Sequence, residues 1–96
     1  MRVLLQAHLD TEKTNEVIRS GKMPQVMQEV MGAFKPEAAY FGPDGGVRSM
    51  FLVFDMQDTS QIPPITEQLF QKFGATVDYT PVMNQEDLQK GLAQLK

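Results

Sequence analysis

Apolar residues occupy both faces of the stretch from Phe34 to Asp55, which the pattern predicts to be two strands joined by a turn. Successive side chains of a strand point to opposite sides of the sheet. In the second strand, large apolar side chains leave both sides, Met50, Leu52 and Phe54 on one and Val47, Phe51 and Val53 on the other. An antiparallel sheet with one solvated face normally alternates apolar and polar positions. The pattern therefore predicts that both faces of this sheet are covered.

The rest of the chain divides into further strands and helices. Apolar residues that alternate predict strands, whereas apolar residues spaced by three and four predict helices. Glycine and proline at the expected ends fit helix stops and starts. The predicted elements are strands over 2–9, 34–41, 47–55 and 75–82, a turn over 42–46, and helices over 12–20, 23–32, 60–73 and 85–95.

This order of elements predicts an α+β fold in a single domain over residues 1–96. A β-α-β-β-α-β order with right-handed crossovers favours a ferredoxin-like antiparallel sheet, here followed by a C-terminal helix. The expected strand order is 4-1-3-2, with both main helices on one face.

The uncovered face of that sheet predicts self-association. Four large apolar side chains left in water there would forgo roughly 1.5–3 kcal/mol each. The sum, about 6–12 kcal/mol, rivals the ~5–15 kcal/mol net stability of a whole domain. We therefore expect a homodimer in which two sheets face each other, with larger rings of dimers left open.

Composition narrows the class of protein. The net charge is −3 and the basic residues are scattered, whereas nucleic-acid binding normally needs a basic face. No apolar run approaches the roughly 18–20 residues of a membrane span. The chain has no cysteine, which excludes disulfides and thiolate metal sites and fits a reducing cytoplasm. We expect a soluble cytoplasmic protein without nucleic-acid or membrane partners.

Several short segments resemble a known group of proteins. They are Lys35-Pro36-Glu37-Ala38-Ala39-Tyr40-Phe41, Arg48, Asp55, Glu67 with Phe70, Pro81-Val82-Met83-Asn84 and Glu86-Asp87-Leu88. The pattern, which spans nearly the whole chain, resembles uncharacterised small bacterial proteins of the dimeric α/β-barrel superfamily. That superfamily includes muconolactone isomerases and antibiotic-biosynthesis monooxygenases. The resemblance implies a ligand cavity between the facing sheets and the helices.

No cofactor or metal is expected. Some members of the superfamily bind haem, but the pocket tryptophan of the small haem-degrading monooxygenases has no counterpart, since this chain has no Trp. A zinc site needs three or four ligands, and the chain has one histidine.

Three residues are candidates for catalysis: His8, Tyr40 and Arg48. Histidine titrates near neutral pH and can act as a general base. If the turn spans 42–46, Tyr40 and Arg48 pair directly and share a sheet face, where they can stabilise developing negative charge. The structural alternatives are a hydrogen-bonded histidine at a strand end and an arginine that stacks on Tyr40 at the dimer rim. A one-residue change of register would separate the pair.

Four residues are candidates for ligand binding: Gln6, Met50, Phe54 and Asp78. Gln6 shares a strand face with His8, and Asp78 shares one with two threonines and can turn toward the cavity. Methionine adapts to irregular shapes and can line a promiscuous cavity. The structural alternative for Met50 and Phe54 is ordinary core filling.

Three functions follow. The first is a homodimeric protein that binds a small apolar or aromatic molecule in a cavity between sheet and helices. The second is a cofactor-independent monooxygenase or isomerase acting on a small aromatic or lactone-like acid, with His8 as the base and Arg48 and Tyr40 stabilising negative charge. The third is a structural oligomerisation module. Since fold is not function, the sequence leaves open whether the protein is an enzyme.

Overall fold

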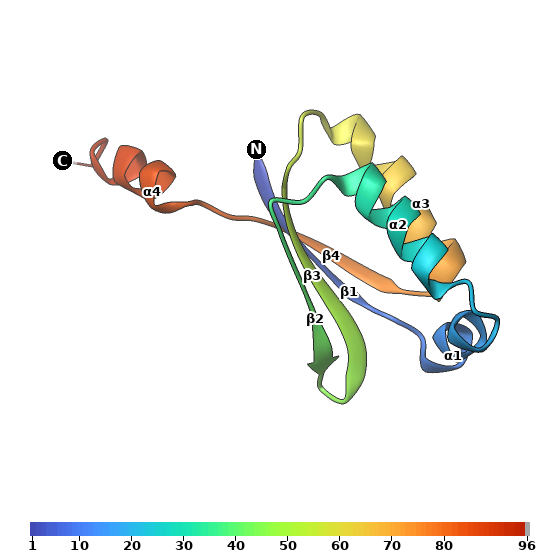
Figure 1. The fold of residues 1–96 in the computed structure, drawn as a ribbon. Coiled ribbons are helices and arrows are strands. Elements are labelled where there is room, and N and C mark those ends of the chain that lie inside the picture. The colour runs from blue at the N-terminus through green and yellow to red at the C-terminus, as the bar shows by residue number, and fades with distance from the viewer. Residues whose placement is uncertain (96) are drawn as a thin grey trace.

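A four-stranded antiparallel sheet with helices on one side forms the body of the computed structural model, which describes residues 1–95 (Figure 1). The strand order β2-β3-β1-β4 confirms the predicted order and gives a ferredoxin-like fold. The elements are β1 (Arg2–His8), α1 (Thr11–Arg19), α2 (Met23–Phe34), β2 (Ala38–Asp44), β3 (Val47–Asp55), the short 3-10 helix η1 (Thr59–Gln61), α3 (Ile62–Phe73), β4 (Thr76–Pro81) and α4 (Gln85–Leu92).

Helix α2 is longer than predicted. The sequence places its end at Gly32 and puts Phe34 in the following strand, but the helix continues through Phe34 and ends where Lys35 adopts a left-handed conformation with φ 47°. Phe34 is buried, and its ring meets that of Phe54 edge to face with centroids 5.5 Å apart. This core contact explains why the helix runs past Gly32, since a single glycine costs a helix only about 1 kcal/mol relative to alanine.

The turn between β2 and β3 is also shorter than predicted. It consists of Gly45-Gly46, with φ 61° and 81°, instead of residues 42–46. Two positive φ values are what a tight two-residue hairpin requires, and glycine adopts them without strain. Strand β2 therefore runs further, and Tyr40 pairs with Phe51 instead of Arg48. The predicted Tyr40–Arg48 pairing is wrong.

The core lies between one sheet face and the helices. Leu5, Met50 and Leu52 are completely buried on this helix-covered face. Helix α3 contributes its own buried side chains and ends, as predicted, at Gly74, which has φ 56°. The buried apolar cluster is formed by Val3, Leu5, Ala7, Leu9, Val30, Phe34, Met50, Leu52, Phe54, Met56, Ile65, Leu69, Phe73 and Ala75.

The opposite sheet face, here called the outer face, carries the other half of the alternating pattern. Its large apolar side chains are only partly buried, and the Tyr40 side chain is 70% exposed. Helices α2 and α3 lie on the far side of the sheet (Figure 1). The strand register places these residues on the outer face: Leu4, Gln6, His8, Ala38, Tyr40, Asp44, Val47, Ser49, Phe51, Val53, Thr76, Asp78 and Thr80.

Helix α4 stands apart from this body (Figure 1). It follows an extended segment after β4, and none of its residues from Gln85 to Leu92 is buried. A capping box starts it, in which the Asn84 side chain accepts from the Asp87 N–H and the Asp87 side chain accepts from the Asn84 N–H. The predicted C-terminal helix is confirmed, but it does not pack on the domain that carries it.

Candidate functional site

His8 lies on the outer face at the end of β1, within hydrogen-bonding distance of a carboxylate. Its Nε2 is 2.9 Å from Oδ2 of Asp44, which belongs to β2. Strand β3 lies between the two residues. His8 faces Ser49 of β3, which in turn faces Gly42 of β2, and these two small residues leave room for the contact. The imidazole thus has an orienting carboxylate that the sequence analysis did not identify.

Arg48 lies on the other face of the sheet from His8 and Tyr40. It pairs with Pro43, and the pairs on either side of this one lie on the outer face. Its Nη1 donates to the carbonyl oxygen of Thr11 at 3.4 Å, a long hydrogen bond. The three predicted catalytic residues are therefore not brought together, because the three-residue difference in register puts Tyr40 opposite Phe51 on the outer face, whereas Arg48 shares the helix-covered face with Met50.

The predicted ligand-binding residues divide between the two faces. Gln6 and Asp78 are direct cross-strand partners on the outer face. Met50 is 0% exposed and Phe54 is 2% exposed, so both lie within the closed core. Phe34 packs on Phe54, which leaves that ring without an open side to present to a ligand.

A groove of about 420 Å³ lies between the sheet and the first two helices. We call it the hairpin groove, because strands β2 and β3 supply most of its wall near their connecting turn. Helix α1 contributes Thr14, and the first residue of α2 closes one side. The lining residues are Leu9, Thr14, Met23, Phe41, Gly42, Pro43, Arg48 and Ser49.

Two residues of the hairpin groove have unused hydrogen-bonding capacity. Thr14 is fully buried, and its Oγ1 has no hydrogen-bond partner among the residues the structure describes. A buried hydroxyl without a partner costs about 1–3 kcal/mol, so such groups are rare. The Arg48 guanidinium has no carboxylate partner within residues 1–95. Because the Thr14 hydroxyl is sealed behind the wall, the groove offers a ligand almost wholly apolar walls and one exposed arginine without a carboxylate partner.

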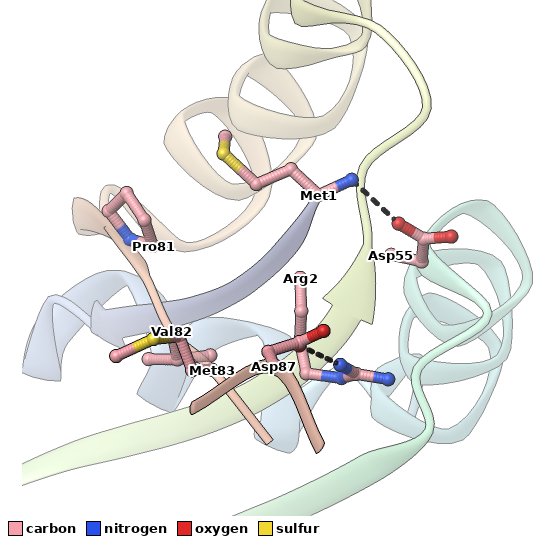
Figure 2. A pocket seen from close by; sticks show the side chains of 7 residues that line it. All are labelled: Met1, Arg2, Asp55, Pro81, Val82, Met83 and Asp87. Carbon is pink, nitrogen blue, oxygen red and sulfur yellow. Dashed lines mark hydrogen bonds and ion pairs between the residues drawn. The ribbon is translucent and has the colours of Figure 1, made fainter. Parts of the chain in front are cut away.

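A second hollow, of about 670 Å³, lies where the C-terminal segment leaves the sheet (Figure 2). Its charged groups already have partners. The N-terminal ammonium of Met1 is 2.8 Å from Oδ1 of Asp55, and Nη1 of Arg2 is 3.0 Å from Oδ2 of Asp87. Although this hollow is larger, its polar groups are satisfied within the chain, which makes it the weaker candidate.

The charges around this second hollow perturb one another in the expected directions. A hydrogen bond from the N-terminal ammonium, helped by Gln57, lowers the pKa of Asp55. The hydrogen bond to Glu37 raises the pKa of the Arg2 guanidinium. Both shifts favour the charged forms that make these pairs.

Sequence reasoning missed Thr14 and Met23 as site residues. Thr14 looks unremarkable in a polar helix, and Met23 reads as the start of an apolar stripe. Only the folded arrangement places them against the β2–β3 hairpin. The local signal for Arg48 is its spacing of two and four residues from Met50 and Leu52, which places it on the helix-covered face.

Two other features, a metal centre and a membrane-spanning helix, find no support among the described residues. Within residues 1–95, no three His, Asp or Glu side chains gather closely enough to hold a metal ion. No helix in the same range combines the length and apolar character needed to cross a membrane.

Comparison with known proteins supports the fold alone. No protein-family model matches the chain, and no curated protein sequence matches it. A formyltetrahydrofolate deformylase from Pseudomonas putida KT2440 aligns over 84% of this chain with 11% identity and a TM-score of 0.50, and the chain spans 28% of that protein's length. The designed protein Ferredog-Diesel aligns over 84% of this chain and 85% of its own, with 10% identity and a TM-score of 0.49.

An uncharacterised NIPSNAP domain protein from Burkholderia xenovorans aligns over 88% of this chain and 97% of its own. The identity is 12% and the TM-score is 0.44. The deformylase, with a TM-score of 0.50, supports the fold alone, and none of these similarities assigns an activity.

Proposed function

We propose that this protein is a homodimer, joined through the outer faces of its sheets, that binds a small apolar carboxylic acid in the hairpin groove. One observation carries the ligand: the exposed side chain of Arg48, which has no carboxylate partner within residues 1–95, lies in the wall of an otherwise apolar groove. An arginine pairs with a carboxylate through two parallel hydrogen bonds, which is stronger than a neutral contact. Ligand sites typically combine mostly apolar walls with a few polar groups of this kind.

The apolar part of the groove sets the shape of the ligand. Leu9, Met23 and Phe41 line it, so a flat or branched hydrocarbon body is favoured over a sugar or nucleotide. Phe41 is largely exposed in the free protein although it lies on the helix-covered face. An aromatic or aliphatic ligand body would bury this ring.

The separation of the predicted catalytic residues supports binding over catalysis by that trio. Arg48 faces the groove, whereas His8 and Tyr40 lie on the outer face. A single small substrate cannot contact groups on both sides of a closed sheet. Binding needs only the groove and Arg48.

A matched pair of probes tests the ligand. Phenylacetic acid and its neutral amide have the same aromatic body, so calorimetry with both isolates the carboxylate. We expect wild-type protein to prefer the acid. Arg48→Gln should weaken acid binding about tenfold or more, since a charge-assisted hydrogen bond contributes about 1.5–3 kcal/mol. Binding of the amide should not change.

Two further variants complete the test. Thr14→Val keeps the shape and removes a hydroxyl that is buried behind the groove wall, so it should leave binding of both probes unchanged. Arg19→Gln removes an exposed arginine from the last turn of α1, outside the groove, and should change neither affinity. Equal binding of the acid by wild type and Arg48→Gln would contradict the proposed site.

The proposed dimer has its own test. Light scattering at micromolar concentration should give twice the chain mass, because the outer face offers a broad apolar surface. A strictly single-chain mass would exclude the dimer and leave the groove proposal intact.

A further inference from the structure

Helix α4 carries an apolar edge that nothing in its own chain covers. Leu88 and Leu92 of α4, and Leu95 just beyond its end, are 42%, 54% and 72% exposed, and they recur at helical spacing. The molecule measures 56 × 28 × 18 Å, and its radius of gyration is 15.3 Å. A compact chain of about 100 residues has a radius of about 13 Å. The projecting C-terminal segment accounts for this elongation (Figure 1).

A helix this short needs a partner. Helix α4 has eight residues, whereas an isolated helix below about 12–15 residues is marginal in water. The capping box at Asn84 and Asp87 and the exposed Glu86–Lys90 pair give local support. Most helical stability in proteins nevertheless comes from burying an apolar face. The amphipathic pattern of α4 indicates a surface against which it packs.

Arg2 sets the side of the sheet on which α4 begins. Its position in β1 alternates with the core residues Val3 and Leu5, so its side chain lies on the outer-face side. From there Nη1 binds Asp87, and Nε binds Glu37. Figure 2 shows Asp87 facing the Arg2 guanidinium beside the C-terminal segment. Helix α4 therefore starts level with the outer face and continues away from its own sheet (Figure 1).

The outer face is the matching surface. Leu4, Phe51 and Val53 form a partly exposed apolar strip across its central strands. The chain thus has two uncovered apolar surfaces, this strip and the edge of α4, and its own α4 points away from the strip. A second copy supplies both surfaces at once, and a twofold axis makes the exchange reciprocal.

We propose that α4 is an exchanged arm: its edge of Leu88, Leu92 and Leu95 packs on the outer face of a second copy, near Phe51. The proposal rests on the self-association proposed above and specifies which segment crosses between the chains. In the dimer each arm encloses the border of the facing sheets, and Arg2 fixes the point from which the arm departs.

Thiol crosslinking tests the arm directly, because the chain has no cysteine and each introduced thiol is unique. Leu92→Cys and Phe51→Cys chains of different tag length are mixed and treated with a flexible thiol–thiol crosslinker. We expect a crosslinked product that contains one chain of each kind. A Leu92→Cys chain mixed with Ile18→Cys, whose thiol lies on α1, should give little product. Equal yields in the two mixtures would overturn the proposal.

The double variant Leu92→Cys with Phe51→Cys distinguishes exchange from folding back. Exchange predicts a crosslinked product of twice the chain mass. Its yield should fall as the variant is diluted with cysteine-free wild-type protein, because a mixed dimer lacks the partner thiol. A product that stays at single-chain mass at every dilution means that α4 closes on its own sheet, which overturns the exchange.

A polar variant separates the arm from the dimer. Leu88→Gln with Leu92→Gln should raise the dimer dissociation constant about tenfold or more, while circular dichroism still shows the folded sheet. An unchanged dissociation constant overturns the arm and leaves the proposed dimer standing. A wild-type protein that is monomeric by light scattering overturns both.

Discussion

The two faces of the sheet are built from the same alternating strands but differ in how deeply their side chains are buried. On the helix-covered face, Leu52 is completely buried beneath the helices. Its sequence neighbour Val53, on the outer face, remains partly exposed. The residues are similar in kind and differ in what lies above them. Hydrophobic side chains on one face stabilise the monomer, whereas those on the other can contribute fully only after association.

This difference gives each face its own dependence on protein concentration. Burial inside one chain is independent of concentration, whereas burial between chains follows mass action. Paired substitutions on adjacent residues can therefore assign a stabilising contact to the fold or to the dimer.

The largest effect is expected at Leu52. Leu52→Ala leaves a cavity in a closed core and should lower the free energy of unfolding by about 2–5 kcal/mol. Urea unfolding at several protein concentrations should show the same loss at each. Val53→Ala, the control on the outer face, should cost less, and its cost should shrink when the protein is diluted. An equal, concentration-independent cost at both positions would remove the proposed distinction between the faces.

The next effect concerns Phe51. Phe51→Asp puts a charge into the proposed interface and should raise the dimer dissociation constant tenfold or more. This corresponds to a loss of at least about 1.4 kcal/mol in the free energy of association. Sedimentation should then show single chains with unchanged helix content. Phe41→Asp, on the other face of the sheet, should leave the dimer intact. Loss of the dimer in both variants would argue against an interface confined to the outer face.

A smaller effect is expected at Tyr79, whose hydroxyl lies 2.6 Å from Oγ1 of buried Thr66. Tyr79→Phe leaves that threonine without its partner and should cost about 1 kcal/mol. Tyr40→Phe, which removes an exposed hydroxyl, should leave monomer stability unchanged. Chemical unfolding of the two variants side by side makes the comparison.

The same tyrosine predicts a dependence on alkaline pH. Burial raises the pKa of Tyr79 above its usual 10.0, so the unfolded chain loses this proton first. Stability should therefore fall as the pH rises above about 10, and the fall should be shallower in Tyr79→Phe. Identical alkaline slopes in both proteins would contradict this assignment.

The smallest effect is expected at Asp55 on the outer-face side. Its pKa is lowered below the usual 3.8 by the N-terminal ammonium, so its contribution is present above that pH and is lost as the pH falls through the folded value. Asp55→Asn should weaken this acid dependence slightly, because the pair is exposed. Urea midpoints between pH 3 and 7 measure it, with Asp78→Asn as the control.

Much of the fold could be predicted from local pattern. The bounds of β3, the strand order and the stop of α3 at Gly74 all follow from alternation, crossover handedness and a C-terminal glycine. The two errors, at Gly32 and in the turn, arise where a local stop signal competes with burial elsewhere. Phe34 overrides Gly32 because its ring finds Phe54 across the core.

The candidate site was harder to predict because it depends on register. Several turn-forming residues precede β3, and nothing local decides which two make the turn. Choosing 42–46 instead of Gly45-Gly46 shifts β2 by three residues and wrongly places Tyr40 on the same face as Arg48. Thr14 and Met23 reach the groove only through the packing of helices on the sheet, which sequence spacing does not determine.

Arg2 joins three remote parts of the chain: its own strand, Glu37 at the entrance to β2, and Asp87 at the start of α4. All three groups contact solvent, so dissolved ions screen them over a Debye length of about 8 Å at 0.15 M salt. Arg2 thereby attaches the start of the C-terminal segment to β1 through an ion pair with Asp87. Higher ionic strength should therefore weaken these two ion pairs while leaving the apolar core unchanged.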